Sequence, residues 1–439
     1  MKMAVVSLGC AKNLVDTEIM LGQLVENGWE LTNDFVEAEL ILLNTCGFIE
    51  SAKKESVDQI LELAEYKKEG KGVCHQLVVA GCLVQRYLND LKKDIPEVDH
   101  WIGLGEIDSV VKLIQNCQPE GEEALKKPFL NDENLPRYQV TLEHTAFVKI
   151  AEGCNHCCSY CAIPIIKGGF RSRQPESIIV EIKKLVASGV KEINLIAQDI
   201  TMYGYDLNQQ VNLVTLLKMI IHEAKPQWLR LLYAYPSGIT SELLQLIADE
   251  PTLCKYLDVP FQHINERILK LMNRPDSPEL LKEKIALIRQ TVPEIVLRTT
   301  FIVGFPSETD QEFMELLQFV KAGLFDHVGV FTYSKEEQTK AFGLKPQIKE
   351  TIKEERKHLL LNEQQKISSD FLKGFLNTEL IILIDKLLPD GRAVGRTAFL
   401  APEIDGVVYM TNYTGIAGQF VKGRIIESDN YNLTAEMMN

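Results

Sequence analysis

Three short apolar runs at the start of the chain each end in a cysteine and recur at a fixed interval. They are AVVSLGC, ELILLNTC and QLVVAGC, ending at Cys10, Cys46 and Cys82, so 36 residues separate each cysteine from the next. Runs rich in Val, Ile and Leu are typical of buried strands, and residues 16–28 and 51–70 between them have helical periodicity. This alternation predicts a doubly wound parallel sheet, an α/β fold, in an N-terminal domain of residues 1–125.

These three cysteines are predicted to meet in space. The C-terminal ends of parallel strands lie at one edge of a sheet, where such folds bind ligands. Gly9, Gly47 and Gly81 stand beside the cysteines and would let the backbone approach a bulky group. Three thiolates can hold a 4Fe–4S cluster and leave one iron open; the alternative is that each cysteine is a small buried apolar residue. Three cysteines elsewhere are assigned to packing: Cys74, Cys117 and Cys254.

A second group of cysteines is crowded into the loop EGCNHCCSYCAIP, residues 152–164. Two zinc knuckles are disfavoured because knuckles are normally about a dozen or more residues apart, and a disulfide is disfavoured in a reducing compartment. The remaining choice leaves Cys157 as a bystander and uses the other three, Cys154, Cys158 and Cys161. This spacing, with Tyr160 before the last cysteine, resembles the radical S-adenosylmethionine (SAM) signature, in which the open iron of a 4Fe–4S cluster takes SAM.

Residues 140–370 read as a second domain. Six strand-like runs, from TAFVKIAEG to HVGVFTYS, alternate with helical patterns, which predicts a partial (β/α)6 barrel. The loops after the strands form the active face of such barrels, and the cysteine loop follows the first strand. Tyr160 and four other residues are candidate contacts to SAM: Arg173, Gln198, Asp199 and Gly304. Each also has a plain structural interpretation, as a cap, a turn or a solvated charge.

The tail, residues 371–439, is predicted to be a small all-β barrel behind a charged linking helix at 349–376. Residues 377–439 contain eight acids and five bases, and the whole chain has a formal net charge of −14. This charge disfavours RNA contact and suits a basic protein partner, with a merely structural cap as the alternative. No apolar run reaches the roughly 18 residues of a membrane span, and the clustered thiols predict a cytoplasmic location without membrane contact.

Motifs spread over essentially the whole chain resemble the methylthiotransferases. They are SLGCAKNLVDTE (7–18), AEGCNHCCSYCAIP (151–164), LDVPFQHINERILKLMNRP (257–275) and APEIDG (401–406), and they are similar to the ribosomal-protein branch, RimO. The resemblance implies a radical SAM core, a C-terminal TRAM barrel and two 4Fe–4S clusters. An auxiliary cluster would be held by Cys10, Cys46 and Cys82, and a SAM cluster by Cys154, Cys158 and Cys161. The chain departs from the usual pattern at Cys157 and Lys167, where the family has a basic residue and an arginine.

The resemblance also implies the reaction. RimO enzymes add a methylthio group to the β-carbon of an aspartate in ribosomal small-subunit protein twelve, using two SAM molecules and an electron donor such as a flavodoxin or ferredoxin. One SAM methylates sulfur at the auxiliary cluster, and the other yields a 5′-deoxyadenosyl radical that takes hydrogen from the β-carbon. That C–H bond is unactivated, so a cofactor must carry the chemistry while the protein positions it. Two other interpretations remain open, a tRNA adenosine methylthiotransferase and, more remotely, a two-cluster electron carrier.

Overall fold

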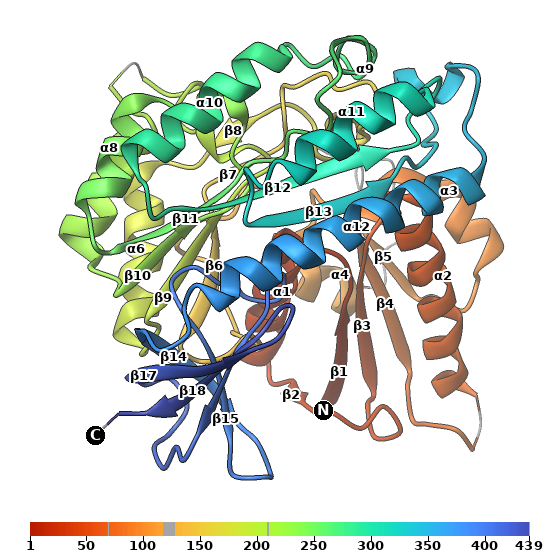
Figure 1. The fold of residues 1–439 in the computed structure, drawn as a ribbon. Helices are drawn as coiled ribbons and strands as arrows, with labels where there is room; N and C mark the ends of the chain where they lie inside the picture. The colour runs from red at the N-terminus through yellow and green to blue at the C-terminus, as the bar shows by residue number, and fades with distance from the viewer. Residues whose placement is uncertain (69, 117–127, 209, 439) are drawn as a thin grey trace.

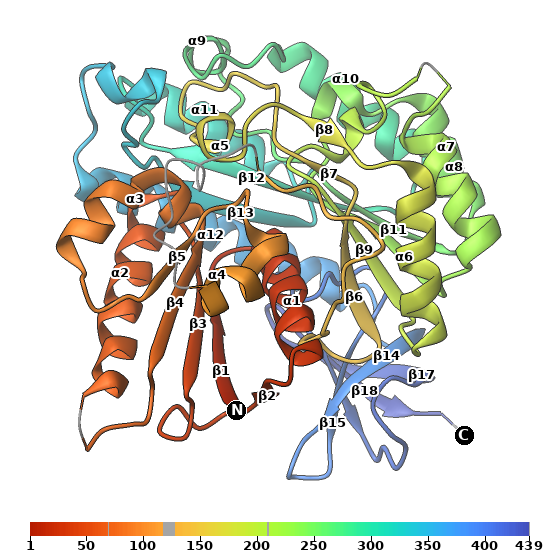
Figure 2. The ribbon, with the colours of Figure 1, turned by 180° about the vertical axis from the view of Figure 1, so that it is seen from behind.

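A computed structural model describes residues 1–68, 70–116, 128–208 and 210–438 (Figure 1). Two parallel sheets with their helices and a small β-barrel make up the molecule, and Figure 2 shows the same arrangement from behind. The predicted fold class is confirmed. Cys117 and the predicted domain boundary at residue 125 lie outside the described residues. Within the described part of the chain, no helix has the length and apolar character needed to cross a membrane.

The N-terminal sheet is entirely parallel, with the order β2-β1-β3-β4-β5. Its strands are β1 (Lys2–Ser7), β2 (Glu30–Leu31), β3 (Leu40–Thr45), β4 (Gln76–Gly81) and β5 (His100–Ile102). Helices α1 (Ala11–Glu26) and α4 (Val110–Asn116) pack on one face, and α2 (Glu50–Ala64) and α3 (Cys82–Asp94) pack on the other. Every residue of β3 is buried because helices cover both faces of the sheet.

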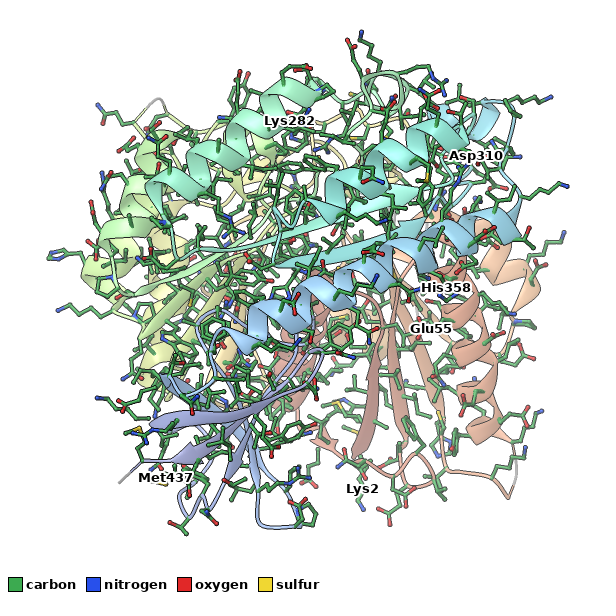
Figure 3. The ribbon with its side chains drawn as sticks, in the orientation of Figure 1. Lys2, Glu55, Lys282, Asp310, His358 and Met437 are labelled. Atoms are coloured by element: carbon green, nitrogen blue, oxygen red, sulfur yellow. The ribbon has the colours of Figure 1, made fainter. Side chains whose placement is uncertain are left out.

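The central sheet is also parallel, with six strands in the order β13-β12-β11-β10-β9-β6. They are β6 (Thr145–Lys149), β9 (Glu192–Ile196), β10 (Trp228–Leu231), β11 (Leu253–Asp258), β12 (Val296–Val303) and β13 (His327–Thr332). Their main covering helices are α6 (Pro175–Ala187), α7 (Leu213–Met219), α8 (Ser241–Asp249), α10 (Pro278–Thr291) and α11 (Asp310–Lys321). Charged side chains such as Lys282 on α10 and Asp310 on α11 point away from the sheet (Figure 3).

The barrel is open between its two edge strands, β6 and β13, and the N-terminal domain lies across this opening. Helix α1 packs against β6. On the other side, Arg86 of α3 is 2.8 Å from Glu336, which follows β13. The N-terminal domain therefore closes the side of the barrel that six strands leave open.

A small antiparallel pair, β7 (Ala151–Glu152) and β8 (Arg171–Ser172), follows β6. It closes the base of the cysteine loop, which continues through the short helix α5 (Ile163–Lys167). Two-residue strands have no readable periodicity, so the sequence did not predict this pair.

The C-terminal domain is a closed barrel of five strands in the order β14-β15-β16-β18-β17. They are β14 (Glu379–Leu387), β15 (Ala393–Arg396), β16 (Val408–Thr411), β17 (Phe420–Ser428) and β18 (Leu433–Met437). The long helix α12 (Glu350–Lys373) leads into it (Figure 1). Arg396 forms a buried ion pair of 2.7 Å with Glu192, the first residue of β9, so this barrel is attached to the amino-terminal ends of the central strands.

Candidate metal centres

The three N-terminal thiols, Cys10, Cys46 and Cys82, follow β1, β3 and β4 at one edge of the sheet. Strand register fixes this arrangement, because Ser7 pairs with Asn44 and Thr45 pairs with Gly81. A Cβ added at Gly9, whose φ is +91°, would lie 2.9 Å from Cys46 Cβ and 3.2 Å from Cys46 Sγ. Only glycine fits there without strain, so the turn after β1 approaches Cys46 closely.

Asn13 joins the three strand ends, and the sequence interpretation missed it. Its Nδ2 donates to the carbonyls of Leu8 (3.2 Å) and Thr45 (3.0 Å), and its Oδ1 accepts from Cys82 Sγ at 3.5 Å. The residue is 1% exposed. A buried amide with two donors and an acceptor can bind several loops at once. In the sequence, the only indication of this role was that Asn13 lies three residues after Cys10.

The N-terminal thiols differ in exposure: Cys10 is exposed, Cys46 is intermediate and Cys82 is buried. Burial raises the pKa of Cys46, and it raises the pKa of Cys82 to about 12. A buried neutral thiol becomes a metal ligand by losing its proton, and the charge of the metal then stabilises the thiolate. The donor type and the close glycine suit an iron–sulfur cluster. In the described residues, no three His, Cys, Asp or Glu side chains are grouped to hold a single metal ion.

The second group of thiols, Cys154, Cys158 and Cys161, lies beyond β6 in the cysteine loop, residues 152–164. We call this loop the SAM loop and these three the SAM-loop thiols; the loop is held from several sides. The backbone N–H of Cys154 donates to Gly168 at 3.1 Å, and that of Ser159 donates to Met272 at 2.9 Å. Burial raises the pKa of Cys154 to about 11 and that of Cys161 to about 12. These thiols also become thiolates when they bind a metal, whose positive charge stabilises the deprotonated form.

His156 stiffens this loop from inside. Its Nε2 lies 2.7 Å from Asp199 Oδ2, and its ring stacks on Tyr235 with 3.9 Å between centroids. Arg274 lies over the other partner of that stack, 4.2 Å from the Tyr235 centroid. These contacts tie the loop to the residues that follow β9 and β10.

The other predicted site residues fall into two sets. Near the cysteine loop, Asp199 bonds His156, Gln198 Nε2 donates to Glu152 at 3.0 Å, and Tyr160 is partly buried in an apolar cluster. In the second set, Arg173 binds Glu181 on α6 and the Lys149 carbonyl, and the N–H of Gly304 donates to Glu308. Gly304 follows β12 and therefore lies on the same C-terminal edge of the central sheet as Gln198 and Asp199, which follow β9.

Cys157 points away from its neighbours. It is exposed, and its Sγ has a weak contact of 3.7 Å with the carbonyl of Asn155. The adjacent backbone carbonyl of Cys157 accepts from Asn273 at 2.7 Å, which fixes the backbone and leaves the thiol outside.

The two thiol groups lie on either side of one domain boundary. Cys82 packs with Ala162, which follows Cys161, and with Ile166 of α5. On the N-terminal side, Lys12 Nζ lies 3.4 Å from the centroid of the Tyr233 ring and 3.5 Å from the Ala197 carbonyl. Both partners of Lys12 lie just beyond strands of the barrel, so the N-terminal edge meets the barrel's active face.

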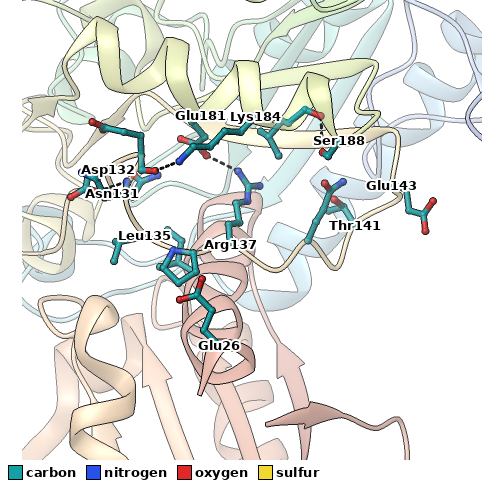
Figure 4. A pocket seen from close by; sticks show the side chains of 16 residues that line it. Glu26, Asn131, Asp132, Leu135, Arg137, Thr141, Glu143, Glu181, Lys184 and Ser188 are labelled. Carbon is teal, nitrogen blue, oxygen red and sulfur yellow. Dashed lines mark hydrogen bonds and ion pairs between the residues drawn. The ribbon is translucent and has the colours of Figure 1, made fainter. Parts of the chain in front are cut away.

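A cavity of about 570 Å³ lies elsewhere, between α1, the linker at 131–143 and α6 (Figure 4). It is lined by Glu26, the last residue of α1, while Cys10 precedes the first residue of that helix. Arg137 on its wall pairs with Glu181 at 2.7 Å. The cavity is therefore at the opposite end of α1 from the thiols, and we assign it to linker packing.

Comparisons with known proteins agree with this architecture. Residues 2–103 match a model described as uncharacterized protein family UPF0004, residues 148–320 match the radical SAM superfamily, and residues 378–438 match the TRAM domain. The ribosomal protein uS12 methylthiotransferase RimO of Geotalea uraniireducens is 46% identical over 442 residues, covering 100% of this chain and 98% of that protein. That of Clostridium botulinum is 46% identical over 437 residues, covering 98% and 97%.

A solved structure with a similar fold is that of TsrM from Kitasatospora setae, a radical SAM methyltransferase with tryptophan and a SAM analogue bound. The TM-score is 0.56 at 16% identity, covering 75% of this chain and 72% of that one. The fold and the matched models define the chain as a radical SAM enzyme, a class that uses an iron–sulfur cluster and SAM. Within that class, the chain belongs to the RimO family of ribosomal protein uS12 methylthiotransferases. It is a transferase of a sulfur-containing group, and neither the tRNA reading nor the electron-carrier reading is favoured.

Proposed function

We propose that the protein methylthiolates the β-carbon of an aspartate in ribosomal protein uS12 with two 4Fe–4S clusters, two SAM molecules and electrons from a flavodoxin or ferredoxin, in the cytoplasm. The observation that carries the proposal is the packing of Cys82, one of the N-terminal thiols, with Ala162 and Ile166, which lie just beyond Cys161 of the second group. Sulfur transfer between two sites needs such proximity, because reacting groups must be held close together.

The N-terminal thiols would hold the auxiliary cluster, and the SAM-loop thiols would hold the SAM cluster. When bound, such clusters supply radical formation from SAM at one site and a place for sulfur at the other. The chain itself supplies orientation: the contact between His156 and Asp199 fixes the SAM loop, and Asn13 fixes the strand ends. Lys12 over Tyr233 joins the two faces. Cys82 and Cys154 are buried, so each group of thiols has one member shielded from water.

The test uses the full chain, reconstituted anaerobically with iron and sulfide, together with three variants. Cys154→Ala should abolish 5′-deoxyadenosine release from SAM. Cys46→Ala should keep that release but lose methylthiolation of uS12, followed by mass spectrometry. Cys254→Ala, which alters a buried cysteine of β11 outside both groups, is the control and should retain both readouts.

Two results would overturn the proposal. Full methylthiolation of uS12 by either Cys154→Ala or Cys46→Ala would show that one triplet is not needed. Methylthiolation of tRNA in place of uS12, in parallel reactions with each substrate, would assign the chemistry to an RNA.

A further inference from the structure

Four charged side chains are buried where the N-terminal domain meets the barrel: Asp16, Lys149, Glu152 and Lys167. We call them the boundary quartet. Asp16 belongs to α1, and the other three end β6, β7 and α5. Each is at most 3% exposed. Buried charges persist only when they are paired, and two cations with two carboxylates balance one another.

The two lysines of the boundary quartet have different surroundings. Lys149 Nζ lies 2.9 Å from Glu152 Oε2 and also donates to Asp16. Lys167 Nζ is farther from the carboxylates, at 3.5 Å from Glu152 and 3.6 Å from Asp16. The carboxylates are thus held mainly by Lys149, and the charge of Lys167 is less fully matched.

Lys167 is also the charged residue that α5 carries toward the N-terminal thiols. The residue before it, Ile166, packs directly against Cys82. Helix α5 packs on α3, whose first residue is Cys82. Lys167 Nζ also lies 3.6 Å from Asp16 of α1, the helix that directly follows Cys10. A cation from the barrel domain therefore lies at the helix ends that carry two of the N-terminal thiols.

We propose that Lys167 is a positioning residue for the auxiliary cluster. Its positive charge offsets the negative charge of the thiolates of Cys10, Cys46 and Cys82. The inference rests on the proposed function, because it requires a cluster on these three thiols. Each thiolate adds a negative charge when it binds metal, and like charges repel strongly where water is excluded. Because the cation comes from the other domain, the charge balance of the cluster depends on the closed domain contact.

Reduction potential is the property that this charge controls directly. The potential of an iron–sulfur cluster depends on the net charge and the hydrogen bonds around its sulfurs. Loss of a nearby positive charge disfavours the added electron, so the potential should become more negative. A merely structural role of Lys167 would change stability or cluster loading without moving the potential of the cluster that remains.

The experiment isolates the auxiliary cluster in the full chain. Cys154, Cys158 and Cys161 are all replaced by Ala, and the chain is reconstituted with iron and sulfide. Iron content and an electron paramagnetic resonance titration are then measured for this background alone and with Lys167→Gln, Lys167→Arg or Lys149→Gln. Lys149→Gln is the matched control because it removes the same charge from the same boundary quartet.

We expect Lys167→Gln to make the potential more negative, Lys167→Arg to restore it, and Lys149→Gln to move it less. An unchanged potential in Lys167→Gln, or equal shifts in Lys167→Gln and Lys149→Gln, would overturn the inference while leaving the proposed function intact. A background that binds no cluster would instead refute the proposed function. If Lys167→Gln does not fold, Lys167→Met removes the same charge while keeping an apolar side chain of similar length, and it carries the same expectation for the potential.

Discussion

At the scale of single residues, Cys157 and Cys158 are neighbours with different environments. Cys158 is partly buried, whereas Cys157 is exposed and its Sγ lies 3.7 Å from the Asn155 carbonyl. We predict that Cys158→Ser loses about half of the bound iron and all 5′-deoxyadenosine release, because three thiolates are needed to hold one of two clusters. Iron and sulfide analysis of reconstituted protein, with SAM cleavage, measures both.

Cys157→Ser is the matched control for this prediction, since it makes the same chemical change one residue away. It should retain wild-type iron content and SAM cleavage. Loss of iron in Cys157→Ser with retention in Cys158→Ser would show that Cys157 is the ligand and would refute the spacing argument.

The sequence led to the thiols through spacing and could not lead to their supports. Cysteines that end equally spaced strands must share a sheet edge, so the placement of Cys10, Cys46 and Cys82 follows from topology. Arg173 was a candidate because of its charge, and in the fold it donates to Glu181 of α6, a pairing that spacing alone does not indicate. Asn13 was missed because its role comes from three loops that only the fold brings together.

At the scale of elements, the turn from β4 into α3 depends on Gly81. Its φ is +105°, and an added Cβ would lie 2.2 Å from Asn44 Oδ1 and 2.5 Å from the Thr45 carbonyl. Gly81→Ala should therefore cost about 1–2 kcal/mol for the left-handed backbone and about 1–3 kcal/mol more for overpacking. Displacement of Cys82 should also reduce auxiliary iron. Denaturant unfolding and iron analysis measure the two effects.

Gly28 provides the comparison for Gly81, because its φ is +87° and nothing lies within 4 Å of an added Cβ. Gly28→Ala should cost only the backbone contribution, about 1–2 kcal/mol, and leave iron content unchanged. Equal destabilisation by the two substitutions would show that contact around Gly81 is not what fixes this turn.

Long periodic elements were predictable and short ones were not. The runs that became β1, β3 and β4 and the helices between them were visible as alternating apolar patterns. The two-residue strands β2, β7 and β8 were not, since two residues define no period. The pair β7 and β8 matters most, because it ties Ala151 to Ser172 at the base of the SAM loop.

At the scale of the whole molecule, the C-terminal barrel is anchored far from the thiol loops. Arg396 binds Asp385 within its own barrel and Glu192 at the start of β9. Burial raises the pKa of Glu192, but Arg396 and Arg230 lower it by more, so the pKa lies below its ordinary value. The SAM loop instead follows the far end of β6, which places this barrel at the base of the central sheet and away from the chemistry.

The N-terminal domain contacts the β13 edge of the central barrel through Glu336, which is 1% exposed. Its carboxylate lies 2.8 Å from Arg86 and 3.1 Å from Lys53, both in the N-terminal domain. Burial raises the pKa of Glu336, but Arg86, Ser334 and Lys53 together lower it by more, so the pKa lies below its ordinary value. A lowered pKa means that the contact is fully present above the unfolded value of about 4.3 and is lost as pH falls through the folded value.

We predict that Glu336→Gln weakens this domain contact by about 3–5 kcal/mol, because it leaves the buried guanidinium of Arg86 without a carboxylate, whereas Lys53 keeps Glu50 at 2.7 Å. Each thiol group should keep its own cluster, so SAM cleavage should continue. The distance between the two sites should become variable, and transfer between them should fail more often. The expected result is a higher ratio of 5′-deoxyadenosine to methylthiolated uS12 at unchanged iron content, measured at pH 7 in single reactions. Glu65→Gln removes an exposed ion pair with Lys68 in the same domain and should leave the ratio unchanged. A wild-type ratio in Glu336→Gln would mean that α1 and the boundary quartet hold the two domains together without this second contact.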